Sequence, residues 1–337
     1  MSATVAPESI LKELAALWTQ EGKQGGAGVL RACSMTLVAI AEADDDAAAL
    51  GETIAALMPE HPARSILIRL SGDKERALSQ RVYQQCWKPF GQRQQICCEQ
   101  IEITASDPAL ADLPSVILPL AVPDLPVILW CRSARLVRRP EFGEIARMAT
   151  KVVIDSARDT DAIDAIRRMA DAVRPGGGIA GPVWADLAWA DLAWTRLTRW
   201  RETLARVFEN RDTLAHLGEV NSVQVRFGPG YDTAAWYLAA WAANALETAG
   251  QTVAPVVGRQ DASLRLKLSG DSFHVELSRQ DDRLVMVVNG QSNCTNLPRP
   301  TDYHLMREEL GIVRRDAIFE GTLASAARLA VSSSGHP

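Results

Sequence analysis

The chain has 337 residues, of which 47% are apolar and 23% are charged, and its formal net charge is -5. This length exceeds the size at which one hydrophobic core usually stops growing, so we expect two domains. The balance of charge lacks the excess of positive side chains that nucleic acid or an anionic membrane surface would attract, which argues against both as partners.

The amino-terminal residues show neither the basic start nor the apolar stretch of a secretion signal. The most apolar stretch, residues 115–131, is interrupted by Pro119, Pro123, Asp124 and Pro126, so we do not expect it to cross a membrane. These features predict a cytoplasmic protein.

The first half of the chain alternates predicted helices with predicted strands. Short apolar runs at residues 64–70, 127–130 and 152–155 are typical of buried strands. Two alternating stretches, residues 80–87 and 95–104, lie too close together for a crossover helix and predict a hairpin. We therefore expect an α/β domain at residues 1–174, three-layer-like, with a mixed, partly parallel sheet. A further strand is expected at residues 29–40. Helices are expected at residues 7–18, 141–149 and 161–173. Two more helices are expected, one that is capped by Asp45 or Asp46 and ends at residue 58, and one that begins at Asp107.

A glycine-rich stretch at residues 22–28 precedes the predicted strand at 29–40. The dinucleotide-binding fingerprint has its glycines after a strand and before a helix. Because the order here is reversed, we do not interpret this stretch as a phosphate-binding loop.

Three consecutive glycines between prolines, at residues 175–182, mark the clearest boundary in the chain and predict a linker. Beyond it, a strand at 222–227 and a helix at 233–249 precede three alternating segments at 263–268, 272–278 and 283–288. A last helix is expected at 302–330. We therefore predict an α+β domain with an antiparallel sheet at residues 183–331, followed by a polar tail at 332–337.

The six cysteines, at positions 33, 86, 97, 98, 131 and 294, form no CxxC pattern and pair with no histidine at zinc-finger spacing. We expect buried free thiols, since unpaired cysteine is among the most buried residue types. The adjacent Cys97 and Cys98 would point to opposite faces of a strand, which argues against a bridge between them.

No recognisable catalytic constellation is present in the sequence. The five histidines are scattered, the carboxylate clusters lie where caps and turns would use them, and no nucleotide, zinc or calcium signature occurs. We therefore expect no metal and no cofactor, although catalytic groups can converge from distant positions.

An arginine-rich segment follows the predicted strand at 127–130. In open α/β sheets ligands bind at the carboxyl ends of the strands, and guanidinium groups suit phosphates or carboxylates. A solvated loop is the favoured interpretation of this segment over a specific anion site. Its arginines are Arg132, Arg135, Arg138 and Arg139.

The tetrapeptide Asp-Leu-Ala-Trp occurs at residues 186–189 and again at 191–194. A step of five residues turns a helix by roughly 140°, so Trp189 and Trp194 cannot share one face of a continuous helix. Either the first copy lies outside the helix or the two indoles face different surroundings. From Asp191 onward an apolar stripe predicts a helix, with Asp191 or Thr198 as its cap.

Four segments of the chain resemble the signature segments of the OpcA family, the glucose-6-phosphate dehydrogenase assembly proteins. They are residues 61–66, 124–130, 153–156 and 191–202, in the order found in that family. The matching positions include Arg64, Asp124, Pro126, Trp130, Asp155, Asp191, Trp200 and Glu202. Arg199 stands where the family has proline, and the copy at 186–189 is an addition.

The resemblance implies a protein without catalytic activity that promotes the assembly or activation of glucose-6-phosphate dehydrogenase, the NADP-dependent entry enzyme of the oxidative pentose phosphate pathway. Tryptophan and arginine dominate interface hot spots, which fits a protein-binding role. The alternative is an enzyme or sensor that binds a sugar phosphate or nucleotide through residues 132–139. We expect the dehydrogenase contact to include Arg132, Arg135, Arg138, Arg139, Trp194, Arg196 and Arg201, whereas most of the other tryptophans form core.

Overall fold

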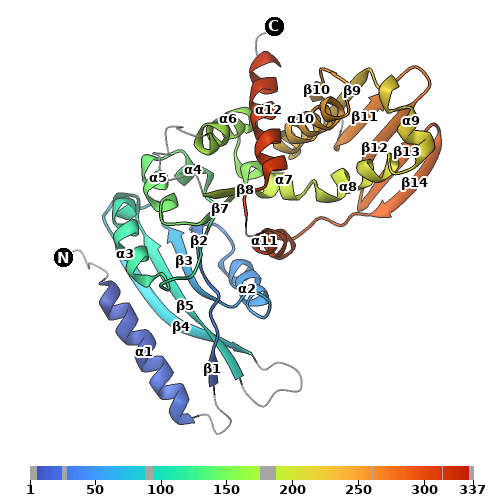
Figure 1. Ribbon diagram of the computed structural model, residues 1–337. Helices are drawn as coiled ribbons and strands as arrows, with labels where there is room; N and C mark the ends of the chain where they lie inside the picture. The colour runs from blue at the N-terminus through green and yellow to red at the C-terminus, as the bar shows by residue number, and fades with distance from the viewer. Residues whose placement is uncertain are drawn as a thin grey trace. The chain divides into compact units, whose positions relative to one another are not determined.

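The computed structural model describes residues 6–24, 29–87, 95–174, 187–259, 262–312 and 314–333. The chain forms two compact units (Figure 1). Unit 1 comprises residues 1–154, 184–189 and 302–315, and unit 2 comprises residues 155–183, 190–301 and 316–337. The predicted linker at 175–182 lies outside the described residues.

An eight-stranded sheet, sheet A, forms the centre of unit 1. Its strand order is β1-β5-β3-β2-β6-β7-β8, with β4 paired to β5. The order of β5, β3, β2, β6, β7 and β8 is that of a doubly wound dinucleotide-binding sheet, 3-2-1-4-5-6. The strands are β1 (Val29–Arg31), β2 (Met35–Glu42), β3 (Ala63–Leu70), β4 (Leu78–Trp87), β5 (Gln95–Ala105), β6 (Val127–Cys131), β7 (Lys151–Ile154) and β8 (Ala188–Asp191).

The central strands of sheet A are parallel and buried along nearly their whole length. β2 pairs with β3 and with β6 in parallel, and Leu37, Ile40 and Ile66 are at most 1% exposed. Such strands are apolar without alternation because helices cover both faces of the sheet. On one face of the sheet, α3 (Leu113–Leu120) contacts both α1 (Pro7–Gln24) and α5 (Pro140–Ala146) (Figure 1). On the other face, α2 (Ala47–Leu57) contacts α11 (Asp302–Gly311). The predicted α/β class with a mixed, partly parallel sheet is confirmed.

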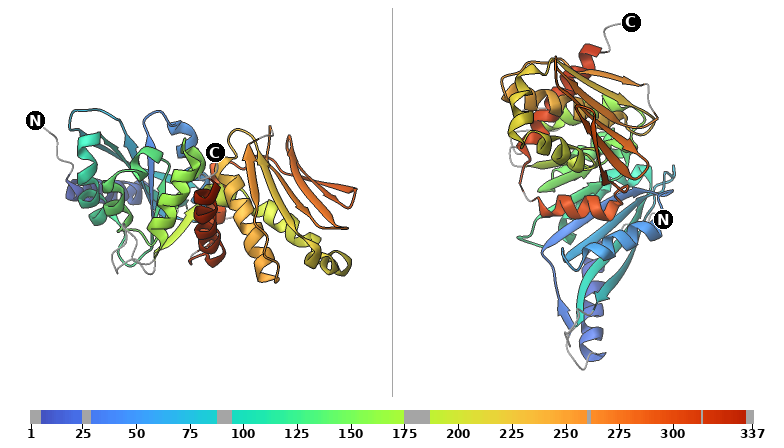
Figure 2. Two further views of the ribbon diagram at one scale, coloured as in Figure 1. Left: turned by 90° about the horizontal axis from the view of Figure 1, so that it is seen from above. Right: turned by 90° about the vertical axis from the view of Figure 1, so that its right-hand side faces the viewer.

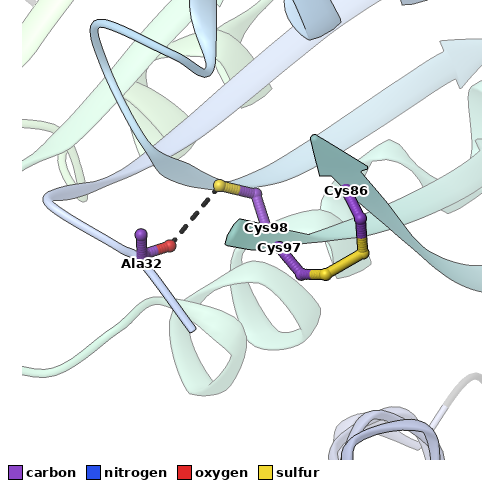
Figure 3. The surroundings of a disulfide bond; sticks show 4 residues. All are labelled: Ala32, Cys86, Cys97 and Cys98. Carbon is purple, nitrogen blue, oxygen red and sulfur yellow. Dashed lines mark hydrogen bonds between the residues drawn. A yellow bond between two sulfur atoms is a disulfide. The ribbon is translucent and has the colours of Figure 1, made fainter. Parts of the chain in front are cut away.

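The predicted hairpin is present as β4 and β5, but the cysteine prediction is wrong for two of its residues. Cys86 lies directly opposite Cys97 in the antiparallel ladder, with their Cα atoms 4.1 Å apart, and the two form a disulfide (Figure 3). The neighbouring Cys98 points away from this bond, and its Sγ lies 3.4 Å from the carbonyl oxygen of Ala32. Burial raises the pKa of Cys98 to about 11. Cys294 is exposed rather than buried.

Three predicted elements are divided differently in the structure. The strand expected at 29–40 is β1 and β2, which occupy different positions in sheet A. The helix expected at 141–149 is α5, which Pro140 starts and which ends at Ala146. A short helix that the sequence did not predict, α4 (Ala134–Val137), lies in the arginine-rich segment before it. The helix expected at 302–330 is α11 in unit 1 and α12 (Ala317–Ser333) in unit 2, because the Asp316 carboxylate accepts backbone N–H groups and starts a new helix. Residues 334–337 of the predicted tail lie outside the described part of the chain.

Unit 2 is built on a six-stranded sheet, sheet B, in the order β10-β9-β11-β12-β13-β14. All its neighbours are antiparallel except β9 and β10, which are parallel. The predicted antiparallel sheet is therefore confirmed for four strands, β9, β11, β12 and β13, whereas β10 and β14 were not expected from the sequence. The strands are β9 (Ser222–Phe227), β10 (Val256–Arg259), β11 (Arg265–Ser269), β12 (His274–Gln280), β13 (Arg283–Val288) and β14 (Gln291–Asn296).

The helices of unit 2 cover one face of sheet B. α10 (Asp232–Thr248) contacts β9 and β10, and α8 (Thr198–Val207) contacts β13. α12 packs against α10 and against α6 (Ala162–Val173). The left view of Figure 2 shows the helices of this unit along one side of the orange strands. Apolar residues of β9, β11 and β12 fill the covered face, among them Val223, Val225, Leu266, Leu268, Val275 and Leu277.

The structure answers the question that the repeated tetrapeptide raises. Residues of the first copy begin β8, whereas the second copy forms α7 (Leu192–Thr195), with Asp191 as its N-cap. The first copy therefore lies outside the helix. The predicted apolar stripe continues into α8, where Trp200, Leu204 and Val207 are buried.

Candidate functional site

The first candidate site lies at the carboxyl ends of β2 and β6, where the strand order of sheet A reverses. Doubly wound sheets bind their ligands at this point, through glycines and the backbone N–H groups of the following helix. Here β2 ends in Glu42, and Asp46 caps α2 by accepting hydrogen bonds from Ala48 N and Ala49 N. A carboxylate of the chain thus occupies the position that a phosphate would take.

The arginine loop, residues 132–139, follows β6 at the same edge. Arg135 pairs with Glu42 at 2.9 Å and with Asp107, and these two carboxylates raise its pKa. Arg132 pairs with Asp45 at 3.1 Å and with Asp302.

The remaining two arginines of the loop differ in exposure. Arg139 contacts Glu141 at 3.0 Å and Asp107 at 3.7 Å. Arg138 is exposed at the carboxyl end of α4. Arg132, Arg135 and Arg139 are therefore held by carboxylates of unit 1 itself, which is the geometry of an ion-pair network rather than of a vacant anion site.

The second candidate site is the Asp191 cluster of unit 2, which we define as Asp191, Ser156, Ala193 and Tyr237. One carboxylate oxygen of Asp191 accepts hydrogen bonds from Ser156 N at 3.0 Å and Ala193 N at 2.9 Å. The other accepts the Tyr237 hydroxyl at 2.8 Å. Asp191 is fully buried, and this burial raises its pKa to about 6. Burial likewise raises the pKa of Tyr237.

Trp194 lies beside this cluster and is only 3% exposed. Its ring packs edge-on against Tyr237, with centroids 6.2 Å apart, and its indole N–H lies 3.4 Å from an Asp316 oxygen. The Arg201 guanidinium sits 3.6 Å from the centroid of the Trp194 ring, a cation–π contact. A buried indole stabilises the core of unit 2, so any effect of Trp194 on a partner would act through the position of Arg201.

Arg196 makes a two-pronged contact with Asp155, at 2.7 Å and 2.8 Å. The Asp155 side chain is 6% exposed and that of Arg196 is 31% exposed. The sequence therefore predicted residues that the structure brings together in unit 2, namely Asp155, Asp191, Trp194, Arg196 and Arg201. It missed Tyr237, Ser156 and Asp316, because a helical pattern does not show where a tyrosine hydroxyl or a capping carboxylate finds its partner.

The other positions that carry the family resemblance are mostly structural. In unit 1, Arg64 is buried, pairs with Glu99 and donates to the carbonyl oxygen of Leu120 at 2.7 Å. Trp130 is fully buried, and Asp124 adopts a left-handed turn with φ of 62° before Pro126. In unit 2, Trp200 is buried, and Glu202 pairs on the surface with Arg199.

Metal-binding groups and membrane-spanning helices are both absent from the part of the chain that the structure describes. No group of three or more His, Cys, Asp or Glu side chains among them could hold a metal ion. Within the same residues, no helix has the length and hydropathy needed to cross a membrane.

Comparison with known protein families gives two matches in order along the chain. Residues 54–171 match the family described as glucose-6-phosphate dehydrogenase subunit N-terminal domain, OpcA type. Residues 187–323 match the corresponding C-terminal domain. These matches fall on both sides of the segment predicted as a linker and together cover more than half of the chain.

Curated proteins that are similar to this chain are named as OpcA proteins. The chain is 24% identical over 207 residues to a protein from Synechocystis sp. named "Putative OxPP cycle protein OpcA", covering 60% of this chain and 40% of that protein. It is also 24% identical over 232 residues to a protein of the same name from Synechococcus elongatus, covering 68% and 47%. The matched part thus spans less than half the length of these relatives.

Among solved structures, a biliverdin reductase from Synechocystis sp. aligns with a TM-score of 0.43 and 10% identity, covering 89% of this chain and 98% of that one. An NAD-binding oxidoreductase from Klebsiella pneumoniae aligns with a TM-score of 0.44 and 10% identity, covering 91% and 97%.

Proposed function

Because the chain belongs to the OpcA family of glucose-6-phosphate dehydrogenase subunits, we propose that it is a non-catalytic partner that binds glucose-6-phosphate dehydrogenase and promotes its assembly or active state. The observation that carries this proposal is the match to both family domains, in order, along most of the chain. The relatives named as OxPP cycle proteins support a place in the oxidative pentose phosphate pathway, and the proposal includes a cytoplasmic location.

The proposed mechanism is allosteric. The protein binds a surface that the dehydrogenase presents preferentially in its active arrangement, so the population of that arrangement rises. A differential binding free energy of about 1–3 kcal/mol is typical of such coupling and is sufficient here. This chain then needs no cofactor of its own.

The alternative, a sugar-phosphate or nucleotide site in the arginine loop, gains no support from the geometry. Arg132, Arg135 and Arg139 already have carboxylate partners, so an anionic ligand would have to displace them. Asp46 holds the helix N-terminus that would otherwise face a phosphate.

Mixing the purified protein with glucose-6-phosphate dehydrogenase from the same organism tests the proposal. We expect complex formation and a change in the turnover or apparent substrate affinity of the dehydrogenase. Calorimetry of this chain alone with glucose 6-phosphate, NADP and NADPH is the control, and we expect no binding heat. Tight binding of one of these ligands, together with unchanged dehydrogenase kinetics, would favour the alternative and overturn the proposal.

The contact residues expected from the sequence remain part of the proposal: Arg132, Arg135, Arg138 and Arg139 in unit 1, and Trp194, Arg196 and Arg201 in unit 2. Arg138 is the exposed arginine of the loop, and reversing its charge tests whether the loop takes part in the contact. If the loop contacts the dehydrogenase, Arg138→Glu lowers the affinity at least about fivefold. Unchanged affinity would remove the loop from the contact.

A further inference from the structure

One face of sheet B carries no helix in the part of unit 2 that the structure describes. In the strand register, residues of β9, β11, β12 and β13 that alternate with the buried ones all point to this side. The bare side of the orange strands lies opposite the helices in the left view of Figure 2. We call it the open face, and its central residues are Gln224, Arg226, Val256, Arg265, Lys267, Glu276, Val285 and Val287.

The open face is basic although the whole chain is acidic. Its strands carry Arg226, Arg265, Lys267 and Arg283, against one carboxylate, Glu276. Glu276 lies 3.6 Å from Arg265. No carboxylate of the described residues lies within ion-pair distance of Arg226, Lys267 or Arg283, whereas Arg132, Arg135 and Arg139 in the arginine loop are all paired.

Arg226 is held against the surface of the sheet. Its guanidinium extends over Gly258 on the neighbouring strand β10, and a Cβ atom at that position would overlap it. A glycine in a strand is otherwise unfavourable, and one of its uses is to let another group approach the backbone closely. The guanidinium is therefore positioned flat on the open face rather than extended into solvent.

An ordinary solvent-facing sheet surface does not account for these residues. Arg226 lies directly opposite Arg265 in the ladder, and like charges in that position destabilise a sheet. Val256 is 51% exposed, and Val285 and Val287 are half-buried on the same face. Cations that repel one another beside partly exposed valines are the groups that an acidic protein surface with an apolar contact would cover.

We propose that the open face of sheet B is a surface on which an acidic patch of glucose-6-phosphate dehydrogenase docks. This inference rests on the proposed function, and it adds a surface to the contact residues expected from the sequence. The cations Arg226, Lys267 and Arg283 steer an acidic partner to the correct face and fix its orientation. The valines of β10 and β13 supply apolar contact on either side of Arg226 and Lys267.

Two other occupants fit the face less well. Proteins that bind single-stranded nucleic acid on a sheet stack the bases on aromatic side chains, and the open face carries none among its described residues. A second copy of this chain would bring the same basic face against itself, and the cations would repel. An acidic protein surface satisfies both the charge and the valines.

The test reverses two central charges in the full-length protein, Arg226→Glu with Lys267→Glu, and measures the affinity for the dehydrogenase by interferometry. We expect the variant to bind the dehydrogenase roughly tenfold more weakly than the wild type does. We also expect its affinity to depend less on the salt concentration, in a range of about 50 to 300 mM. The matched control, Arg206→Glu with Arg211→Glu, makes the same change of charge at two exposed positions, one in α8 and one at the start of α9 (Arg211–Ala215). It should bind within about twofold of wild type. Arg226→Gln with Lys267→Gln is the second variant if the reversal impairs folding, which circular dichroism would reveal.

Each outcome separates the two proposals. A wild type that binds, with an open-face variant that binds equally well, overturns the docking surface and leaves the proposed function intact. A wild type that never binds or activates the dehydrogenase removes the proposed function, and the docking surface with it. Two other outcomes would also overturn the inference. The wild type could form a dimer in sedimentation velocity, or it could bind a single-stranded oligonucleotide. If the charge reversal abolishes either of these, the open face belongs to that occupant instead.

Discussion

Asp191 is a fully buried carboxylate with three hydrogen-bond donors around it. Two of these donors are backbone N–H groups, which favour the ionised form, but burial is the larger effect and raises the pKa to about 6. The ordinary pKa of an Asp side chain, 3.8, applies in the unfolded state. Between about pH 4 and pH 6, Asp191 therefore keeps its proton in the native state, whereas it has lost the proton in the unfolded state. The contribution of the Asp191 proton to the free energy of unfolding is fully present below about pH 4, and it is lost as the pH rises through about 6.

We expect Asp191→Asn to remove this pH dependence. The amide oxygen can still accept from Ser156 N and Ala193 N, and the amide N–H group can donate to the Tyr237 hydroxyl oxygen, so the variant keeps the cap without a buried charge. Between pH 4 and pH 7 its free energy of unfolding should rise relative to wild type by about 2–3 kcal/mol. Urea unfolding at both pH values measures this change.

Asp191→Ala is the control, because it removes both the charge and the hydrogen bonds. It should lower the free energy of unfolding by about 2–4 kcal/mol at pH 7, through the loss of a cap and the exposure of buried donors. A constant difference between Asp191→Asn and wild type across the pH range would contradict the assignment of a raised pKa.

Sequence patterns predicted the elements of this protein well where the signal is local. The buried strands β3, β6 and β7 and the hairpin of β4 and β5 follow from apolar runs and alternation over a few residues. β14 was missed because all its residues are exposed at the sheet edge, so it has no apolar period. The break between α11 and α12 was missed because the Asp316 cap interrupts an otherwise continuous helical pattern.

The candidate sites show the same limit. The sequence correctly predicted that the arginine loop follows a central strand, at the carboxyl edge of sheet A. It could not predict that Arg135 would meet Glu42, which lies 93 residues earlier in the chain. Whether an arginine is paired or unpaired depends on such distant partners, and for that reason the basic open face of sheet B was recognised only in the structure.

The disulfide between Cys86 and Cys97 stabilises the β4–β5 hairpin. It closes a loop with a sequence separation of 11 residues. Loops of this size contribute about 2–3 kcal/mol by restricting the unfolded chain. We expect Cys86→Ser with Cys97→Ser to lower the free energy of unfolding by that amount while preserving the fold, as measured by urea unfolding without reductant.

Dithiothreitol provides the matched comparison. It should destabilise the wild type and Cys33→Ser equally, since Cys33 is not disulfide-bonded, and should leave the double variant unchanged. A wild type that does not respond to reductant would show that the hairpin does not depend on the bond.

At the scale of the whole molecule, sheet A has the strand order of a dinucleotide-binding sheet, but the described turns at its switch point differ from those of a dinucleotide site. The turn after β2 carries Asp45 and Asp46 in place of glycines, and arginines of the loop after β6 form ion pairs with carboxylates of unit 1. A fold therefore does not decide the activity, which depends on the residues at the crevice. The same architecture can serve as a scaffold that presents surfaces to another protein, as we propose here.

The division of the chain into units predicts how fragments behave. Residues 1–174 correspond to the first domain expected from the sequence, but unit 1 ends at residue 154 and also includes residues 184–189 and 302–315. The last of these segments contains α11. Lys151 on β7 is buried, and its ammonium group donates to the Glu309 carboxylate at 2.8 Å and to the carbonyl oxygens of Glu309 and Ile312. Without α11, this ammonium group loses its partners, a change that costs about 3–5 kcal/mol for a buried ion pair.

We therefore expect the fragment 1–174 to unfold without a sharp transition or to aggregate. Adding a peptide of residues 302–315 should stabilise the fragment, because it returns the partners of Lys151 together with the buried Leu305 and Met306. Lys151→Met in the fragment should restore part of the lost stability, since a methionine needs no partner in an apolar site. If the fragment alone unfolds as cooperatively as it does with the peptide, α11 is not needed for unit 1, and the boundary near residue 174 is a true domain boundary.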